Sequence, residues 1–173
     1  MNQILLSADE VRVLGALMEK RITTPEYYPL SLNALTNACN QKSNRDPVMS
    51  YNDVDMARLV DGLRDKRLVA MVTGASATVS RVPKYRELFS ETIGLDEKGM
   101  ALMCELMVRG PQTAAQLRSR GERLHKFADL AEVDAALQDL MSREFPLVVK
   151  MPRQTGFKEG RYAHLLCGAP PVS

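Results

Sequence analysis

The 173-residue sequence contains no tryptophan, only three cysteines and two histidines, and almost no net charge. Its 23 Lys and Arg residues nearly balance its 21 Asp and Glu residues, so the total charge of +2 does not by itself indicate a nucleic-acid ligand. A hydrophobic share of 45% with a charged share of 25% is typical of a soluble globular protein, and excludes disordered, collagen-like and disulfide-dense classes. At roughly 100–200 residues per domain, the length allows one ordinary domain or two small ones.

The sequence also lacks features of export. Its first residues show no basic segment before an apolar core and no small-residue cleavage site, so we expect no signal peptide. The longest nearly charge-free run, Val69 to Ser80, is far shorter than the ~20 apolar residues of a membrane span. The cysteines, Cys39, Cys104 and Cys167, are widely separated and odd in number, which predicts buried thiols in a reducing compartment. The sequence therefore predicts a cytoplasmic protein without a membrane partner.

Catalytic and metal-binding patterns are missing as well. His125 and His164 lie far apart, and no Cys-x-x-Cys or His-x-x-x-His spacing is present. Neither a glycine-rich phosphate loop nor a Gly-x-Ser-x-Gly elbow occurs. We therefore expect no enzyme, no cofactor, no metal and no catalytic residue. An enzyme that holds a small ligand in the loop of residues 40–45 is a distant alternative.

What the sequence does contain is an internal repeat. Two segments have helical apolar spacing at an offset of 89 residues: Val11, Leu14, Leu17 and Met18 in the first, and Met100, Met103, Leu106 and Met107 in the second. Ser7, with Glu10 three positions on, forms a capping-box pattern before the first segment, and Asp96 is the expected cap of the second. The methionines are expected in the core, with an interface stripe as the alternative.

Further elements follow in the same order in both copies. Second helices are expected over 30–40 and 114–120, and third helices over 50–66 and 128–144. The apolar positions of the two third helices match at an offset of 77: Met56, Val60 and Leu63 with Val133, Leu137 and Leu140. The first copy is thus about twelve residues longer between its first and third helices. Hairpins are expected from strands 68–72 and 78–82, turning at 73–76, and from strands 147–151 and 161–166. A short linking helix is expected near 84–89, with the join between copies at 89–95.

This order predicts an α+β, mainly α fold with two tandem winged helix-turn-helix domains, each of three helices plus a β-hairpin wing. The first domain is expected over residues 1–90 and the second over residues 91–173. Domains of this size bury only about 60–65% of their unfolded surface. We therefore expect the two copies to pack on each other or on a second chain.

The third helix of a winged helix commonly enters the DNA major groove, but both third helices here are acidic. Residues 50–66 carry a net charge of −1 and residues 128–144 a net charge of −4. Phosphates repel such helices. A solvated face, or a face for a basic partner, is the simpler interpretation of both.

Positive charge is concentrated in the connections instead. Residues 118–126 and 150–161 each carry a net charge of +3, and residues 40–45 are polar and basic. Nine residues are candidates for binding nucleic acid through its phosphates: Lys42, Arg45, Arg118, Arg120, Arg123, Lys126, Arg153, Lys158 and Arg161. The alternative is that charged residues are simply common in loops, and that Asn40 and Asn44 cap a helix and brace a loop.

Nine short stretches carry a resemblance to a known family: Glu19-Lys20, Thr23-Thr24-Pro25-Glu26, Tyr28-Pro29-Leu30-Ser31, Ala38-Cys39-Asn40-Gln41-Lys42, Asn44-Arg45, Pro47-Val48-Met49, Leu117-Arg118-Ser119-Arg120, Arg161-Tyr162 and His164-Leu165. On these residues the chain resembles the YceH-like family of uncharacterised bacterial proteins, from about Leu6 to Gly168. The resemblance implies a tandem winged-helix fold and implies no activity, ligand or catalytic residue.

Two functions follow as hypotheses. The first is a DNA-binding protein with a regulatory role in transcription, which contacts phosphate through the basic loops and wing. The second is a protein–protein interaction or scaffold module, which uses the acidic third helices and the Met-rich first helices. The expected partners are accordingly double-stranded DNA, a second copy of the chain in a homodimer, or another protein.

Overall fold

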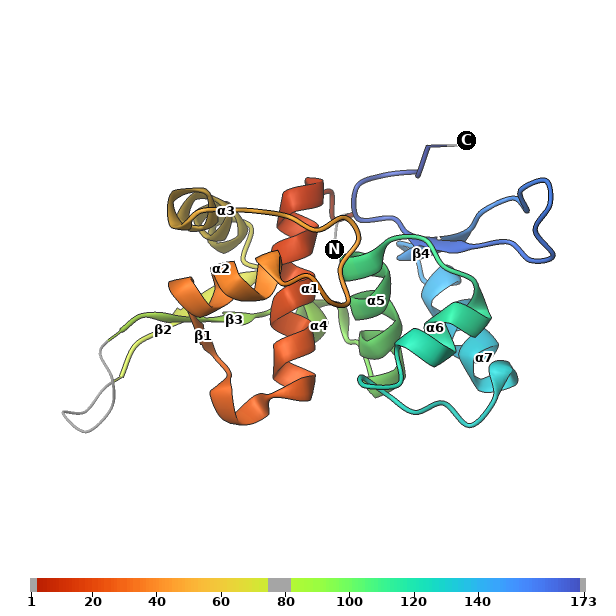
Figure 1. The fold of residues 1–173 in the computed structure, drawn as a ribbon, viewed down its shortest axis with the longest axis horizontal. Coiled ribbons are helices and arrows are strands. Elements are labelled where there is room, and N and C mark those ends of the chain that lie inside the picture. Colours follow the sequence, from red (N-terminus) through yellow and green to blue (C-terminus); the bar gives the residue numbers. More distant parts are fainter. Residues whose placement is uncertain (1–2, 75–81, 172–173) are drawn as a thin grey trace.

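The computed structural model describes residues 3–74 and 82–171 of the chain, which form a mixed α+β fold made mainly of helices (Figure 1). The first part of the chain contains α1 (Ala8–Thr23), η1 (Pro25–Tyr27), β1 (Leu30–Ser31), α2 (Leu32–Asn40), α3 (Asp53–Asp65), β2 (Val69–Val72) and β3 (Lys84–Glu87). The helix α4 (Phe89–Ile93) follows, and then come α5 (Glu97–Arg109), α6 (Ala114–Arg120), α7 (Leu130–Met141), β4 (Val148–Lys150) and β5 (Tyr162–His164). We call the elements from α1 to β3 the first half, and those from α5 to β5 the second half.

Local sequence signals start the helices as predicted. The Ser7 hydroxyl accepts a hydrogen bond from the Glu10 amide at 3.1 Å, and the Glu10 carboxylate accepts one from the Ser7 amide at 3.0 Å. This capping box satisfies amide groups that the first turn of α1 leaves unpaired. Asp96 caps α5 through the Gly99 amide at 2.8 Å. The predicted spacing is also observed, since α5 begins 89 positions after α1 and α7 begins 77 positions after α3.

The strands form two small antiparallel sheets. One has the order β1-β3-β2, and the other consists of β4 and β5. In the second sheet Gln112 makes an isolated bridge with Tyr162, with N–O distances of 2.7 and 3.1 Å. Gln112 therefore occupies in the second half the place that β1 occupies in the first, and the two halves share their order of elements.

The hairpin of the first half differs from its prediction. The linking helix expected over residues 84–89 is wrong, because Lys84–Glu87 is the strand β3, which pairs with β2 from Val69↔Glu87 to Val72↔Lys84. A helix begins only at Phe89. Most of the predicted return strand, residues 78–81, lies outside the described residues. Residues 84–87 form a strand because they pair with both β1 and β2, and a local sequence pattern does not reveal such pairing.

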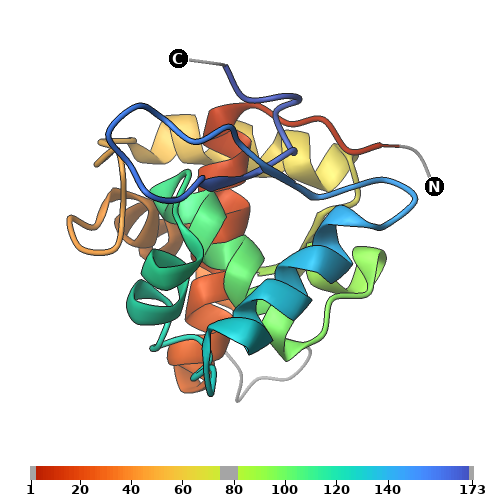
Figure 2. The ribbon, with the colours of Figure 1, turned by 90° about the vertical axis from the view of Figure 1, so that its right-hand side faces the viewer.

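The two halves pack together through α1 and α5, which cross near Gly15 (Figures 1 and 2). A Cβ atom on Gly15 would lie 2.8 Å from Cγ1 of Val108, so the absence of a side chain there permits the close approach. Met103 and Met107 are buried and Met100 is partly buried against the same core, which confirms their prediction as core residues. The hairpins β2–β3 and β4–β5 extend toward opposite ends of the molecule (Figure 1).

The cysteine prediction is confirmed in part. Cys39 and Cys104 are buried, and burial raises the pKa of the Cys39 thiol to about 12. The prediction is wrong for Cys167, which is exposed. Leu166 takes the core position beside it, and Cys167 lies in the turn that brings Leu166 and Gly168 together. Among the described residues, no helix has both the length and the apolar character needed to cross a membrane.

Candidate nucleic-acid interface

The outer face of α7 carries no positive charge. Asp129 caps this helix through the Glu132 amide at 2.9 Å. Val133, Leu137 and Leu140 turn one face into the core, while Asp134 and Asp139 lie on the exposed face and Leu130, at the start of the helix, is 40% exposed. Since Leu130–Met141 contains three carboxylates and no Lys or Arg, α7 alone would be repelled by phosphate.

Cations surround α7 on the hairpin side. A hollow of about 560 Å³ lies between α7 and the hairpin β4–β5, and Lys150, Arg153 and Lys158 line it from the hairpin. Asp134 and Gln138 line it from the helix. The Lys150 ammonium lies 5.7 Å from the centre of the Tyr162 ring, in cation–π range.

A second hollow, of about 330 Å³, lies on the other side of Leu130. Arg118 and Lys126 line it, together with Glu122 and Phe127, and Leu130 lines both hollows. The structure thus brings cations from three separate segments to the two sides of one helix. We call the residues Arg118, Lys126, Lys150, Arg153 and Lys158 the basic face.

Arg118 also has a role within the fold. Its guanidinium donates to the carbonyl oxygens of Phe127 at 3.4 Å and Ala128 at 2.8 Å, which braces the connection between α6 and α7. The side chain remains exposed, so its outer edge is open to a ligand. Lys42, Arg120 and Arg161, the other candidates with solvent access, do not line either hollow.

Arg45 lies away from the solvent. The residue is 6% exposed, and its guanidinium donates to both carboxylate oxygens of Glu19, at 2.8 and 2.9 Å. It also donates to the Ala38 carbonyl at the end of α2, at 2.9 Å. Every edge of this guanidinium is directed to a protein partner, which leaves none for phosphate.

Arg123 joins the two halves at the same place. It donates to Glu19 on α1 and to Glu105 on α5, both at 2.8 Å. Both carboxylates belong to residues that are 1% exposed. Arg109 Nε lies 2.6 Å from the second oxygen of Glu105, and Arg109 also donates to the side chain of Asn44. We call Glu19, Arg45, Glu105, Arg109 and Arg123 the inter-half ion network.

The surroundings of Glu19 and Arg123 favour the charged states of both residues. Burial alone would raise the pKa of Glu19, but the hydrogen bonds and charge of Arg45, the hydrogen bond of Arg123 and the charge of Lys20 lower it to about 2. The carboxylate pairing also raises the pKa of Arg123 against the opposing effect of burial. These arginines therefore stabilise the packing of the halves.

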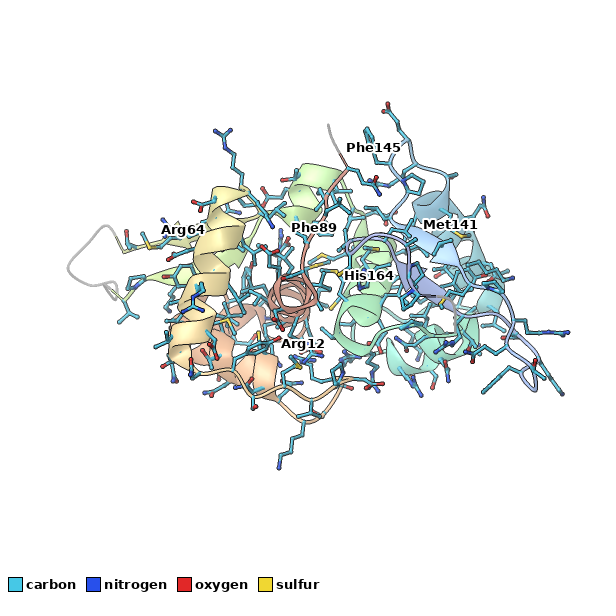
Figure 3. All side chains as sticks on the ribbon, turned by 90° about the horizontal axis from the view of Figure 1, so that it is seen from above. Arg12, Arg64, Phe89, Met141, Phe145 and His164 are labelled. Carbon is cyan, nitrogen blue, oxygen red and sulfur yellow. The ribbon has the colours of Figure 1, made fainter. Side chains whose placement is uncertain are left out.

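Arg12 is a buried cation that the sequence did not single out. It lies near the middle of the molecule (Figure 3) and donates to the carbonyl oxygens of Cys39 at 3.3 Å, Pro47 at 2.7 Å and Val108 at 3.5 Å. Cys39 and Val108 lie in the last turns of α2 and α5, where carbonyls lack helical partners and the helix dipole is negative. Two helix ends thus stabilise the charge. A basic residue among the buried positions of α1 was the available signal.

The two histidines add no strong site. Burial lowers the pKa of His164 to about 4, and its Nδ1 accepts a hydrogen bond from the Leu166 amide at 3.2 Å, so the ring is neutral near pH 7. His125 lies 3.7 Å from Glu132. Within residues 3–74 and 82–171, no three His, Cys, Asp or Glu side chains are grouped to hold a metal ion.

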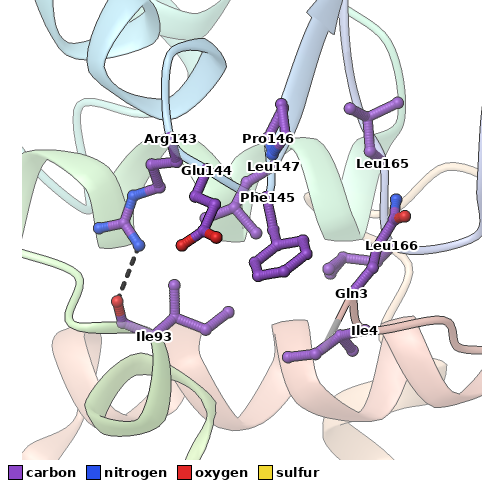
Figure 4. Close-up of a pocket in the computed structure, with 10 residues that line it drawn as sticks. All are labelled: Gln3, Ile4, Ile93, Arg143, Glu144, Phe145, Pro146, Leu147, Leu165 and Leu166. Carbon is purple, nitrogen blue, oxygen red and sulfur yellow. Dashed lines mark hydrogen bonds between the residues drawn. The ribbon is translucent and has the colours of Figure 1, made fainter. Parts of the chain in front are cut away.

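A third hollow is apolar. It has a volume of about 290 Å³ and lies between the N-terminal segment, α4 and the connection from α7 to β4 (Figure 4). Ile4, Ile93, Phe145 and other apolar side chains line it. The Arg143 guanidinium on its wall already donates to the Ile93 and Gly94 carbonyls, at 2.7 and 2.9 Å. The pocket therefore offers mainly apolar surface and no paired catalytic groups.

Comparison with known proteins gives a family without an assigned activity. The chain is 55% identical to a UPF0502 protein of Geotalea uraniireducens, over 95% of this chain and 73% of that protein. It is 55% identical to a UPF0502 protein of Pelobacter propionicus, over 96% and 74% of the two chains, and 51% identical to one of Opitutus terrae, over 98% and 73%. Residues 6–157 match the family described as "Protein of unknown function, DUF480". The chain belongs to this family of bacterial proteins, in agreement with the resemblance found in the sequence.

Proposed function

We propose that this protein binds double-stranded DNA as a tandem winged-helix protein, and that the basic face holds the phosphate backbone. The observation that carries the proposal is the placement of five cations from three segments around the two hollows beside α7. The order of elements in each half, with three helices before a hairpin, is the order found in winged helix-turn-helix domains. A cytoplasmic role in regulating transcription is the function we assign to it.

The charge distribution defines how the duplex would approach. Lys and Arg side chains position DNA through phosphates without reading sequence. Because Asp134 and Asp139 occupy the outer face of α7, that helix stays out of the major groove in our proposal. The hairpin β4–β5 and the connection before α7 make the backbone contacts instead.

A salt titration tests the proposal. Binding of a labelled random duplex, measured by fluorescence anisotropy at several salt concentrations, should weaken with a log–log slope of about −0.9 per phosphate contact. Changing Arg153 and Lys158 together to Ala should weaken binding to all sequences alike and reduce the slope by about 2. Lys42→Ala is the matched control, since Lys42 is exposed but lies outside both hollows. The absence of binding at low salt, or equal effects of the double variant and the control, would overturn the proposal.

A partner protein is the second candidate. The exposed face of α7, with Leu130, Asp134 and Asp139, suits a partner that presents basic and small apolar side chains. Met103 and Met107 do not serve this role, because both are buried within the chain. A second copy is one such partner, and light scattering distinguishes it from a 19.3 kDa monomer.

A further inference from the structure

One phenylalanine is placed unlike the others. The chain has four phenylalanines, of which Phe89 and Phe127 are buried and Phe145 is half-buried. Phe157, in the loop of the hairpin β4–β5, is 62% exposed. Burial of so large an apolar side chain against a ligand would gain free energy.

The loop holds Phe157 at its tip. The Phe157 amide donates to the Gln154 carbonyl at 3.1 Å, which closes a four-residue turn. Gly156, at the third position of the turn, has a φ of +89°, which side-chain-bearing residues rarely adopt. At the base of the loop a Cβ atom on Gly160 would lie 2.7 Å from the Met151 carbonyl oxygen, so this glycine allows the two strands to approach. The tip is therefore a built turn on a paired hairpin.

Two cations flank Phe157 in the sequence of the loop. Arg153 and Lys158 stand on either side of Phe157 in the loop, and both also line the hollow beside α7. The hairpin extends outward from the body of the molecule at the end of its long axis (Figure 1). A duplex held by these two cations would bring a groove edge to the tip of the loop.

We propose that Phe157 is a wedge that inserts between base pairs of the duplex while Arg153 and Lys158 hold the flanking phosphates. This inference rests on the proposed function and names the contact that lies beyond phosphate binding. Apolar side chains that enter a groove partly unstack a base step, and the kinked duplex then meets more protein surface. Such a wedge favours flexible pyrimidine–purine steps, so the protein should prefer TA-rich over A-tract duplexes.

The absence of tryptophan provides a direct test. Phe157→Trp introduces the only tryptophan of the variant, which can be excited at the long-wavelength edge of protein absorption, where the five tyrosines contribute little. Tyr27→Trp is the matched control, since Tyr27 is 72% exposed and lies on η1 of the first half. Titration with a duplex at low salt should quench the emission of the variant at position 157 by stacking, and leave that at position 27 unchanged.

Affinity measurements complete the test. Phe157→Ala should weaken binding about 10-fold or more, because base–aromatic stacking is lost. Phe157→Tyr should retain most of the affinity, and both variants should keep the thermal midpoint of the parent because the side chain is exposed.

The outcomes separate this inference from the proposed function. Binding of the parent protein with no quenching at position 157 and no loss in Phe157→Ala would overturn the wedge and leave phosphate binding standing. If no protein binds duplex at low salt, both proposals fall. Quenching of the variant at position 157 by anionic phospholipid vesicles, without quenching by duplex, would assign the exposed ring to a membrane surface and overturn the wedge.

Discussion

The connections between the second and third helices differ most between the two halves. Residues 41–52, between α2 and α3, fold back against the second half. The Asp46 amide donates to the Val108 carbonyl at 3.0 Å, and Asn44 accepts from Arg109. Arg45 pairs within the first half with Glu19, which in turn accepts from Arg123 of the second half. Residues 121–129, between α6 and α7, contribute only Arg123 to this junction, and Lys126 stays exposed beside a hollow.

The difference shows how one order of elements can serve two purposes. The longer connection of the first half supplies contacts that join the halves, and the shorter one leaves its cations on the surface. The exposed side chains of the two hairpins also differ. Met71 and Val72 are exposed on β2, whereas the second hairpin presents Arg153, Lys158 and Phe157. The longer connection of the first half thus adds contacts that join the halves, and in our proposal the basic face of the second half binds the ligand.

The largest expected effect tests the joining role. Glu19→Gln should lower the free energy of unfolding by about 3–5 kcal/mol, because it leaves Arg45 buried without its carboxylate and removes one of the two carboxylates paired with Arg123. Glu105→Gln should lower the free energy of unfolding by less, because Arg109 is less buried than Arg45 and keeps its contact with Asn44. Urea denaturation monitored by circular dichroism measures both.

Glu91→Gln is the control for these two variants. Glu91 pairs with Arg86 at 2.9 Å on the surface, where an ion pair contributes less than about 1 kcal/mol. Losses at Glu19 and Glu105 as small as that at Glu91 would show that the network does not hold the halves together.

The second prediction concerns acid. The pKa of Glu19 is about 2 in the folded protein against an ordinary value of 4.5. A lowered carboxyl pKa stabilises the folded state above pH 4.5, and this contribution, of the order of 3 kcal/mol, is lost as the pH falls from 4.5 toward 2. Unfolding free energies measured from pH 7 to pH 3 should therefore decline most steeply below pH 4.5.

His164 supplies an internal comparison from the second half alone. Its pKa is about 4 against an ordinary 6.5, so the folded state resists protonation and loses stability as the pH falls from 6.5 toward 4. His164→Gln should remove the decline in this upper window and keep the decline below pH 4.5. If His164→Gln abolished the whole loss of stability between pH 7 and pH 3, the role given to Glu19 would be contradicted.

Much of the fold could be predicted because its signals are local. Ser7 with Glu10, and Asp96, place the starts of α1 and α5, and apolar spacing places the buried faces. The strand β3 could not be predicted in this way, because Lys84–Glu87 becomes a strand through pairing with residues far away in the sequence. Exposure of Cys167 likewise depends on which neighbour fills the core.

The candidate site was harder to predict, since residue type does not reveal partners. Arg45 and Arg153 both lie in basic loops of the sequence, yet one is paired with Glu19 and the other lines a hollow. The distinguishing signal was Glu19, a carboxylate at the end of a run of buried α1 residues, which requires a buried cation nearby. The identity of that cation follows only from the tertiary fold.

The prediction with the smallest expected effect compares Gly15, a helical glycine at the junction of the halves, with Gly62, a helical glycine away from it. Gly15→Ala places a Cβ 2.8 Å from Cγ1 of Val108 and 3.1 Å from Cβ of Met107, so α1 and α5 must separate, at a cost of about 1–3 kcal/mol. Gly62→Ala in α3 meets only Glu10, at 3.6 Å, and should raise stability by about 0.5–1 kcal/mol because alanine favours the helix. Thermal unfolding of both variants should show a lower midpoint for Gly15→Ala and a higher midpoint for Gly62→Ala than for the parent protein. A gain at both positions would mean that the halves tolerate separation along α1, and that the ion network rather than the helix crossing sets their arrangement.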